Sequence, residues 1–83
     1  MFHRIDTVKP LPEYKLLVKF RNGESKTYDM KPLIDNREPF MPLGYVPSLF
    51  NQVYVDKGGY GVVWNDEIDL SCDSLYEGGK PVQ

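Results

Sequence analysis

Residues 14–30 read YKLLVKFRNGESKTYDM, and this stretch decides the fold. It opens with a run of aliphatic, β-branched and aromatic residues, which favours a strand from Tyr14 to Phe20. Asn22-Gly23 follows, and this pair between two such runs is typical of the turn of a β-hairpin. We therefore expect two antiparallel strands joined at Gly23.

Two registers are open to this hairpin, and burial chooses between them. A two-residue loop would place the polar residues of the second strand on the apolar face of the first. A three-residue loop, with Gly23 in the left-handed conformation, shifts the pairing by one residue and places Tyr28 opposite Leu16. We predict this second register. Its consequences are a positive φ at Gly23, exposed Lys19 and Arg21, and burial of Leu16, Val18 and Phe20.

The rest of the chain is divided into short elements by seven Pro and seven Gly. The pattern predicts a first strand from Ile5 to Lys9 that stops at Pro10. A second hairpin is predicted from strands at 52–55 and 60–64, with a tight turn at 57–59 between them.

Short helical segments are predicted where proline or a capping residue stands at a helix start. Single turns are expected at 31–34 and 47–50, each opened by proline, and a helix over 72–77 is expected with Ser71 as its N-cap. We expect residues 35–45 to form a loop whose apolar members, Phe40, Met41 and Leu43, pack onto the core as a lid.

These elements predict an α+β fold with a small antiparallel sheet of about four to five short strands, short helical turns and a short C-terminal helix. At 83 residues the chain has room for one hydrophobic core. We predict a single domain over 1–79 and a frayed tail over 80–83.

The composition is that of an ordinary folded protein, with 41% hydrophobic and 27% charged residues. One cysteine leaves no internal disulfide, and the N-terminus has no apolar run resembling a signal peptide. No stretch approaches the roughly 20 apolar residues of a membrane span. We expect a cytoplasmic protein that does not enter a membrane.

Charge is distributed unevenly along the chain, whose formal net charge is −2. Residues 1–40 hold 8 basic against 6 acidic side chains, whereas residues 41–83 hold 2 against 6. A nucleic-acid-binding protein usually carries a basic excess. The whole chain does not, so nucleic acid is not expected as a partner of this chain alone. The uneven charge fits either a dipolar surface for a partner or two differently charged solvated faces.

The sequence holds few residues that could act as a nucleophile, a base or a metal ligand. Cys72 and His3 are the only members of their kinds and stand at opposite ends of the chain, so a Cys–His pair is not expected. Four nitrogen or sulfur ligands for zinc are lacking. The carboxylates at 66, 67, 69 and 73 lack the spacing of a calcium loop, and helix capping explains Asp69 and Asp73. We predict no catalytic residue, no cofactor and no metal.

Two surfaces are candidates for binding a macromolecule. The acidic second half offers a partner-binding set, with Trp64 either anchoring the partner or filling the core: Trp64, Asn65, Asp66, Glu67, Asp69 and Asp73. The first hairpin offers a nucleic-acid-binding set with Tyr14 and Tyr28 between its cations: Lys15, Lys19, Arg21 and Lys26. Exposed lysines that prevent sheet aggregation are the alternative explanation of the second set.

Several segments, in this order and at these spacings, resemble the bacterial family catalogued as domain of unknown function 2442. They are 16–24 (LLVKFRNGE), 28–30 (YDM), 32–34 (PLI), 49–53 (LFNQV), 63–64 (VW), 68–71 (IDLS) and 75–77 (LYE). The resemblance covers about residues 5–77 and implies a small α+β fold without a known activity. It also implies a partner, because members often occur beside another small uncharacterised protein, as toxin–antitoxin pairs do.

From these observations we predict a non-catalytic protein-interaction module, antitoxin-like in a two-gene pair, whose partner is a small basic protein encoded nearby. The alternative is a nucleic-acid-binding accessory domain that uses the basic first hairpin. Self-association stays open.

Overall fold

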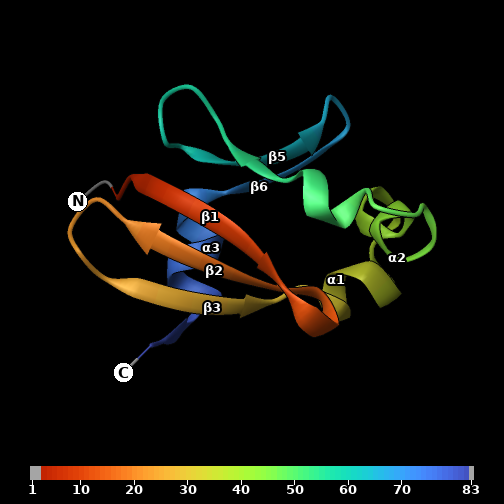
Figure 1. Cartoon of the computed structure of the whole chain (residues 1–83), viewed down its shortest axis with the longest axis horizontal. Helices are drawn as coiled ribbons and strands as arrows, with labels where there is room; N and C mark the ends of the chain where they lie inside the picture. The colour runs from red at the N-terminus through yellow and green to blue at the C-terminus, as the bar shows by residue number, and fades with distance from the viewer. Residues whose placement is uncertain (1–2, 83) are drawn as a thin grey trace.

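The computed structural model describes residues 3–82. Its strands form two antiparallel sheets, in the orders β1-β2-β3-β7 and β4-β5-β6. The larger sheet contains β1 (Ile5–Leu11), β2 (Lys15–Phe20), β3 (Ser25–Asp29) and β7 (Lys80–Pro81). The smaller contains β4 (Tyr54–Val55), β5 (Gly61–Asn65) and β6 (Ile68–Ser71). Figure 1 shows the larger sheet in front, with the smaller one above it. The predicted α+β class is confirmed.

The first hairpin has the predicted register. Leu16 lies opposite Tyr28, and the amide of Phe20 donates a hydrogen bond to the Glu24 carbonyl at 2.8 Å. Gly23 has a φ of 96°, as the three-residue loop requires. The predicted burial is also confirmed. The three apolar residues on alternate positions of β2 are buried, and Lys19 and Arg21 are exposed.

The first strand is longer than predicted. β1 continues through Pro10 to Leu11 and pairs with β2 along its length, with a bulge between Ile5 and Thr7. Proline does not end the strand because β1 is an edge strand, where a missing N–H on the free side costs no sheet hydrogen bond.

The second hairpin forms where predicted, but it is part of a three-stranded sheet. Residue 52 belongs to a 3-10 helix, η3 (Phe50–Gln52), so β4 has only two residues. β6 was not predicted, although Ile68-Asp69-Leu70-Ser71 alternates apolar and polar residues as a strand does. It pairs with β5 and places Leu70 opposite Val62.

The segment predicted as a loop at 35–45 is largely helical, so that prediction is wrong. α1 (Lys31–Asn36) runs past the expected turn, and it is followed by the 3-10 helix η2 (Glu38–Phe40) and by α2 (Pro42–Tyr45). Pro39 and Pro42 each stand in a first helical turn, where a missing N–H breaks no hydrogen bond. Leu43 packs into the core as expected, but Met41 is exposed.

The C-terminal helix α3 (Cys72–Gly78) begins as predicted. The Ser71 hydroxyl accepts a hydrogen bond from the amide of Ser74 at 3.1 Å. Beyond it, where fraying was expected, residues 80 and 81 form β7 against β3, and the amide of Val82 donates to the Ser25 carbonyl at 2.9 Å. The unpaired edge of β3 offers these backbone groups a partner. Gln83 lies outside the described residues.

One hydrophobic cluster joins the two sheets and α3. Leu16, Val18 and Phe20 contribute from the larger sheet, Val62 and Trp64 from the smaller one. A further 3-10 segment, η1 (Pro12–Tyr14), connects β1 to β2 and has positive φ at Glu13 and Tyr14. Within residues 3–82, no helix has the length and apolar character needed to cross a membrane.

Candidate interaction surfaces

His3 and Cys72, the possible base and nucleophile, both pack against other side chains of the fold. The imidazole of His3 stacks on the ring of Tyr76, with 3.6 Å between ring centroids. Cys72 is buried at the start of α3, and burial raises the pKa of its thiol. The thiol therefore stays protonated at neutral pH, as the packing of an inert cysteine requires. Among residues 3–82, no three His, Cys, Asp or Glu side chains gather in a group that would hold a metal ion.

Trp64 lies in the core. Its exposed fraction is 3%, and its indole N–H donates to the carbonyl of Phe50 at 3.1 Å. Of the two roles open to Trp64, the structure therefore supports core packing. A ring in this position offers no surface to a partner.

The acidic set does not form one cluster. Asn65 ends β5, and Asp66 and Glu67 form the turn to β6. The Asn65 side-chain oxygen accepts hydrogen bonds from the backbone amides of Glu67 and Ile68, both at 2.9 Å. Asp69 lies on the outer face of the smaller sheet, opposite Val63. Asp73 stands in the first turn of α3, where its carboxylate suits the helix dipole.

The basic set is divided between the two faces of the larger sheet. Lys15 and Lys19 share the outer face, which we call the open face, because residues on alternate positions point to the same side. Lys26 lies opposite Val18 and so points to the inner side, where its ammonium donates to the Tyr76 carbonyl at 2.6 Å. Arg21 follows the end of β2 and lies beside the turn at Gly59.

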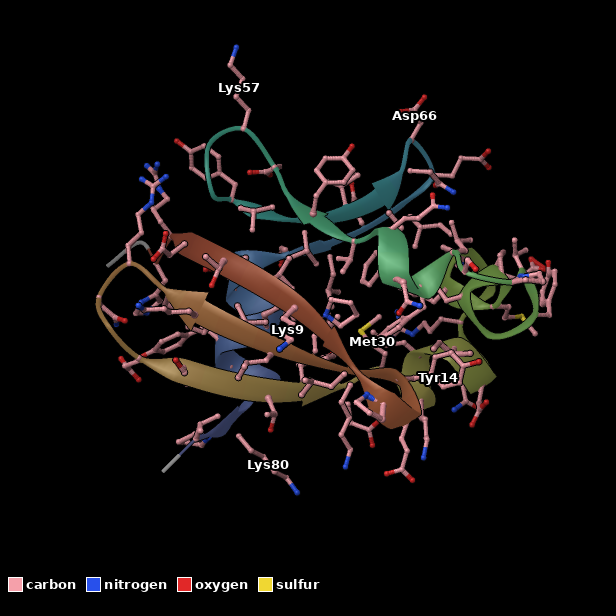
Figure 2. All side chains as sticks on the ribbon, in the orientation of Figure 1. Lys9, Tyr14, Met30, Lys57, Asp66 and Lys80 are labelled. Carbon is pink, nitrogen blue, oxygen red and sulfur yellow. The ribbon has the colours of Figure 1, made fainter. Side chains whose placement is uncertain are left out.

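Two lysines that were not singled out from the sequence complete the open face. Register places Lys9 on the same side as Leu17, and Lys80 on the same side as Thr27. Figure 2 shows Lys9 and Lys80 at opposite edges of the sheet. Finding Lys9 required knowing where the β1 bulge falls, and finding Lys80 required β7.

An apolar groove of about 680 Å³ lies between α2 and the β5–β6 turn. Its apolar lining comes from Pro39, Pro42, Val46, Leu49 and Ile68. Its polar lining comes from Glu38, Asn65 and Glu67, so both of its charged groups are carboxylates. The groove thus brings part of the predicted acidic set beside the segment that was expected to be an apolar lid.

A second hollow, of about 550 Å³, lies between η1 and residues 43–48, which include most of α2. Three non-glycine residues with positive φ line it, namely Glu13, Tyr14 and Ser48. The sequence gives no sign of this, because none of the three is a residue type that turn patterns select for the left-handed region.

The family model described as "Protein of unknown function (DUF2442)" matches residues 5–81. The chain belongs to this family. The match covers both sheets and α3, which agrees with the segments that carried the resemblance. No curated protein matches the chain.

The fold of this DUF2442 protein is similar to a crystal structure, that of "Putative DNA Binding Protein NE0471" from Nitrosomonas europaea ATCC 19718. The TM-score is 0.78 at 22% sequence identity, over 94% of this chain and 49% of the other. The chain therefore spans about half the length of that neighbour. At this identity the likeness shows a shared fold.

Proposed function

We propose that this protein is a non-catalytic protein-interaction module that binds an apolar, basic segment of a partner protein in the groove between α2 and the β5–β6 turn. The observation that carries the proposal is the composition of the groove, which combines an apolar floor with two carboxylates and no cation among residues 3–82. An apolar centre with a charged rim is the usual anatomy of a protein interface.

The apolar part of the groove supplies the area to be buried. Val46 has an exposed fraction of 41%, and its neighbours in the groove are proline, leucine and isoleucine side chains. Burial of apolar surface contributes about 25 cal/mol per Å² before the entropic costs of association. The groove is open to solvent, which suits a chain segment more than an enclosed small molecule.

The two carboxylates define the charge of the partner. Glu38 comes from η2 and Glu67 from the β5–β6 turn, so the groove presents acid from two separate elements. A basic segment is attracted to this rim and meets no opposing cation. Such rim charges act mainly on the association rate.

The absence of catalysis is part of the proposal. The buried Cys72 thiol and the stacked His3 imidazole support it, because neither group is placed to act as a nucleophile or base. The partner we propose is a small basic protein encoded beside this one, in an antitoxin-like pairing.

The test is co-expression with the product of the adjacent reading frame, followed by binding kinetics of the purified pair. We expect E38K/E67K to slow association at least tenfold at 50 mM salt, with an effect that shrinks as salt is added. V46D is expected to accelerate dissociation. The matched control is D69K/D73K, which reverses two acidic residues outside the groove and is expected to change association less than twofold.

If E38K/E67K and D69K/D73K slowed association equally, the overall charge of the protein would explain binding. That result would contradict the proposal that the partner binds in the groove. Full binding by V46D, or no complex with the neighbouring product at all, would overturn the proposal. Thermal unfolding of each variant separates these outcomes from misfolding.

A further inference from the structure

The open face of the larger sheet gathers positive charge in an acidic protein. Of the ten Lys and Arg side chains, four lie on this face, namely Lys9, Lys15, Lys19 and Lys80. Two carboxylates of the strands lie there as well: Asp29 opposite Lys15, and Asp6, which stands beside Thr7 in the β1 bulge opposite Lys19. The face therefore carries a local excess of +2, from four lysines and two aspartates, while the chain carries −2. The acids of the second half lie on the smaller sheet and α3.

No described element covers this face. α3 packs behind the sheet, and no helix or strand of residues 3–82 lies in front of it (Figure 1). Three of the four lysines are exposed, and Lys15 is half-buried.

The four ammonium groups are not used inside the fold. They make none of the side-chain hydrogen bonds found within residues 3–82. Other cations are used: Lys26 lies 3.6 Å from the centroid of the Tyr76 ring, and Arg4 lies 4.1 Å from that of Tyr60. The lysines of the open face are therefore available to a ligand.

The strand register fixes the spacing of these charges. Lys15 and Lys19 are four residues apart on β2, which separates their Cα atoms by about 13 Å. Lys9 and Lys80 lie in one row across the sheet, three strand spacings or about 14 Å apart. The four lysines thus form a kite whose diagonals are nearly equal and cross at Leu17, one strand spacing from Lys9 and two from Lys80.

Apart from the two aspartates, the remaining strand positions of the face are hydroxyl or aliphatic side chains. Thr7, Ser25 and Thr27 supply hydroxyl groups, which donate hydrogen bonds to phosphate oxygens in nucleic-acid complexes. Lys15, Thr27 and Lys80 also line one hollow of about 370 Å³ at the β3 edge, with Asp29 in its wall. Two lysines and one hydroxyl side chain therefore border the same hollow.

We propose that the open face binds the phosphate backbone of a nucleic-acid duplex. The diagonals of about 13–14 Å are close to the roughly 12 Å width of the major groove. Opposing lysines can therefore reach phosphates of both strands.

The same observations argue against other anionic ligands. A single strand is favoured by aromatic side chains on which bases stack, but Tyr28 points to the inner side of the sheet, as its pairing with Leu16 requires. A protein partner needs aromatic or other anchors at the centre of its interface, and the central side chain here is a half-buried leucine, Leu17. Duplex phosphates need neither stacking nor an anchor.

The test is fluorescence anisotropy of a labelled 20-base-pair DNA duplex, titrated with the full chain at several salt concentrations. Four phosphate contacts predict a slope of about −3.6 for log affinity against log salt, which is a loss of about 150-fold between 50 and 200 mM salt. K9Q/K19Q/K80Q is expected to reduce the slope to about −0.9. The charge-matched control, K31Q/R37Q/K57Q, removes three cations that lie outside the open face and is expected to keep the wild-type slope.

Equal loss of slope in both triple variants would overturn the proposal, since binding would then follow net charge. So would the absence of duplex binding at 50 mM salt. Polyglutamate or vesicles containing anionic lipid that bound as tightly as the duplex, with the same dependence on the three lysines, would assign the face to a protein or a membrane instead. Substitutions in the groove between α2 and the β5–β6 turn are expected to leave duplex binding unchanged. A negative result for one proposal therefore does not contradict the other.

Discussion

Gly23 holds the first hairpin in its three-residue turn with a φ of 96°. A Cβ built at this position would meet no heavy atom within 4 Å, so a side chain here has space and any cost comes from the backbone alone. We expect G23V to lower the free energy of unfolding by about 1–2 kcal/mol, because a β-branched residue resists the left-handed region. Urea denaturation measures the change.

The matched variant at the same site is G23N. Asparagine tolerates positive φ better than other non-glycine residues, so its cost is expected to be smaller than that of valine. Equal costs for the two substitutions would mean that the backbone conformation is not what Gly23 contributes.

At the scale of elements, Tyr76 connects α3 to the first hairpin. Its hydroxyl donates to a Glu24 carboxylate oxygen at 2.6 Å, and its backbone carbonyl accepts from Lys26. The hydrogen bond from Tyr76 lowers the pKa of Glu24, and the same bond raises the pKa of the Tyr76 hydroxyl. Both shifts favour the bonded protonation states in the folded protein.

This hydrogen bond gives stability a defined pH dependence. The lowered pKa of Glu24 contributes stability above its ordinary value of 4.5, which is lost as pH falls through the folded pKa. The raised pKa of Tyr76 contributes stability below 10.0, which is lost as pH rises through the folded pKa. We expect Y76F to melt below the wild type at pH 7, and the difference to shrink toward both pH extremes. Thermal melts across pH measure this.

The control is Y54F, which removes an exposed tyrosine hydroxyl on β4. Its melting temperature is expected to follow that of the wild type at every pH. A difference between Y76F and wild type that stays constant with pH would contradict the assignment of the shifts to the Tyr76–Glu24 hydrogen bond.

Local patterns predicted the elements whose own residues decide their structure. Asn22-Gly23 and the apolar alternation fixed the first hairpin, and Ser71 marked the start of α3. β7 could not be predicted in this way, because Lys80 and Pro81 have little strand propensity and are ordered by the free edge of β3. η2 and α2 were missed because Pro39 and Pro42 indicate a loop when read singly, whereas each occupies a first helical turn.

The candidate sites were less predictable than the elements, because each gathers residues from distant parts of the chain. The groove combines Glu38 with Glu67, and the open face combines Lys9 with Lys80. Sequence position grouped Lys26 with Lys19, yet the pleat of β3 directs Lys26 to the other side of the sheet. The strand register of the larger sheet is needed to tell which lysines lie on the open face and which, like Lys26, lie on the inner side.

At the scale of the whole molecule, the two sheets share one buried cluster although they have no hydrogen-bonded strand pair in common. Trp64 is the only tryptophan and lies on β5, so its fluorescence reports on the smaller sheet. Leu16 lies fully buried on β2 of the larger sheet. If the two sheets unfold cooperatively, truncation of Leu16 in the larger sheet also destabilises the smaller sheet, where Trp64 detects it.

We therefore expect L16A to lower the free energy of unfolding by about 2–5 kcal/mol, the usual cost of truncating a buried leucine. The Trp64 fluorescence transition should shift together with the far-ultraviolet circular dichroism transition, by about 4–8 °C per kcal/mol. L17A, on the open face of the same strand, is the control and should shift both transitions less, because Leu17 is only half-buried. A Trp64 transition that kept its wild-type midpoint in L16A would mean that the two sheets unfold as separate units, and the prediction of a single domain would then be wrong.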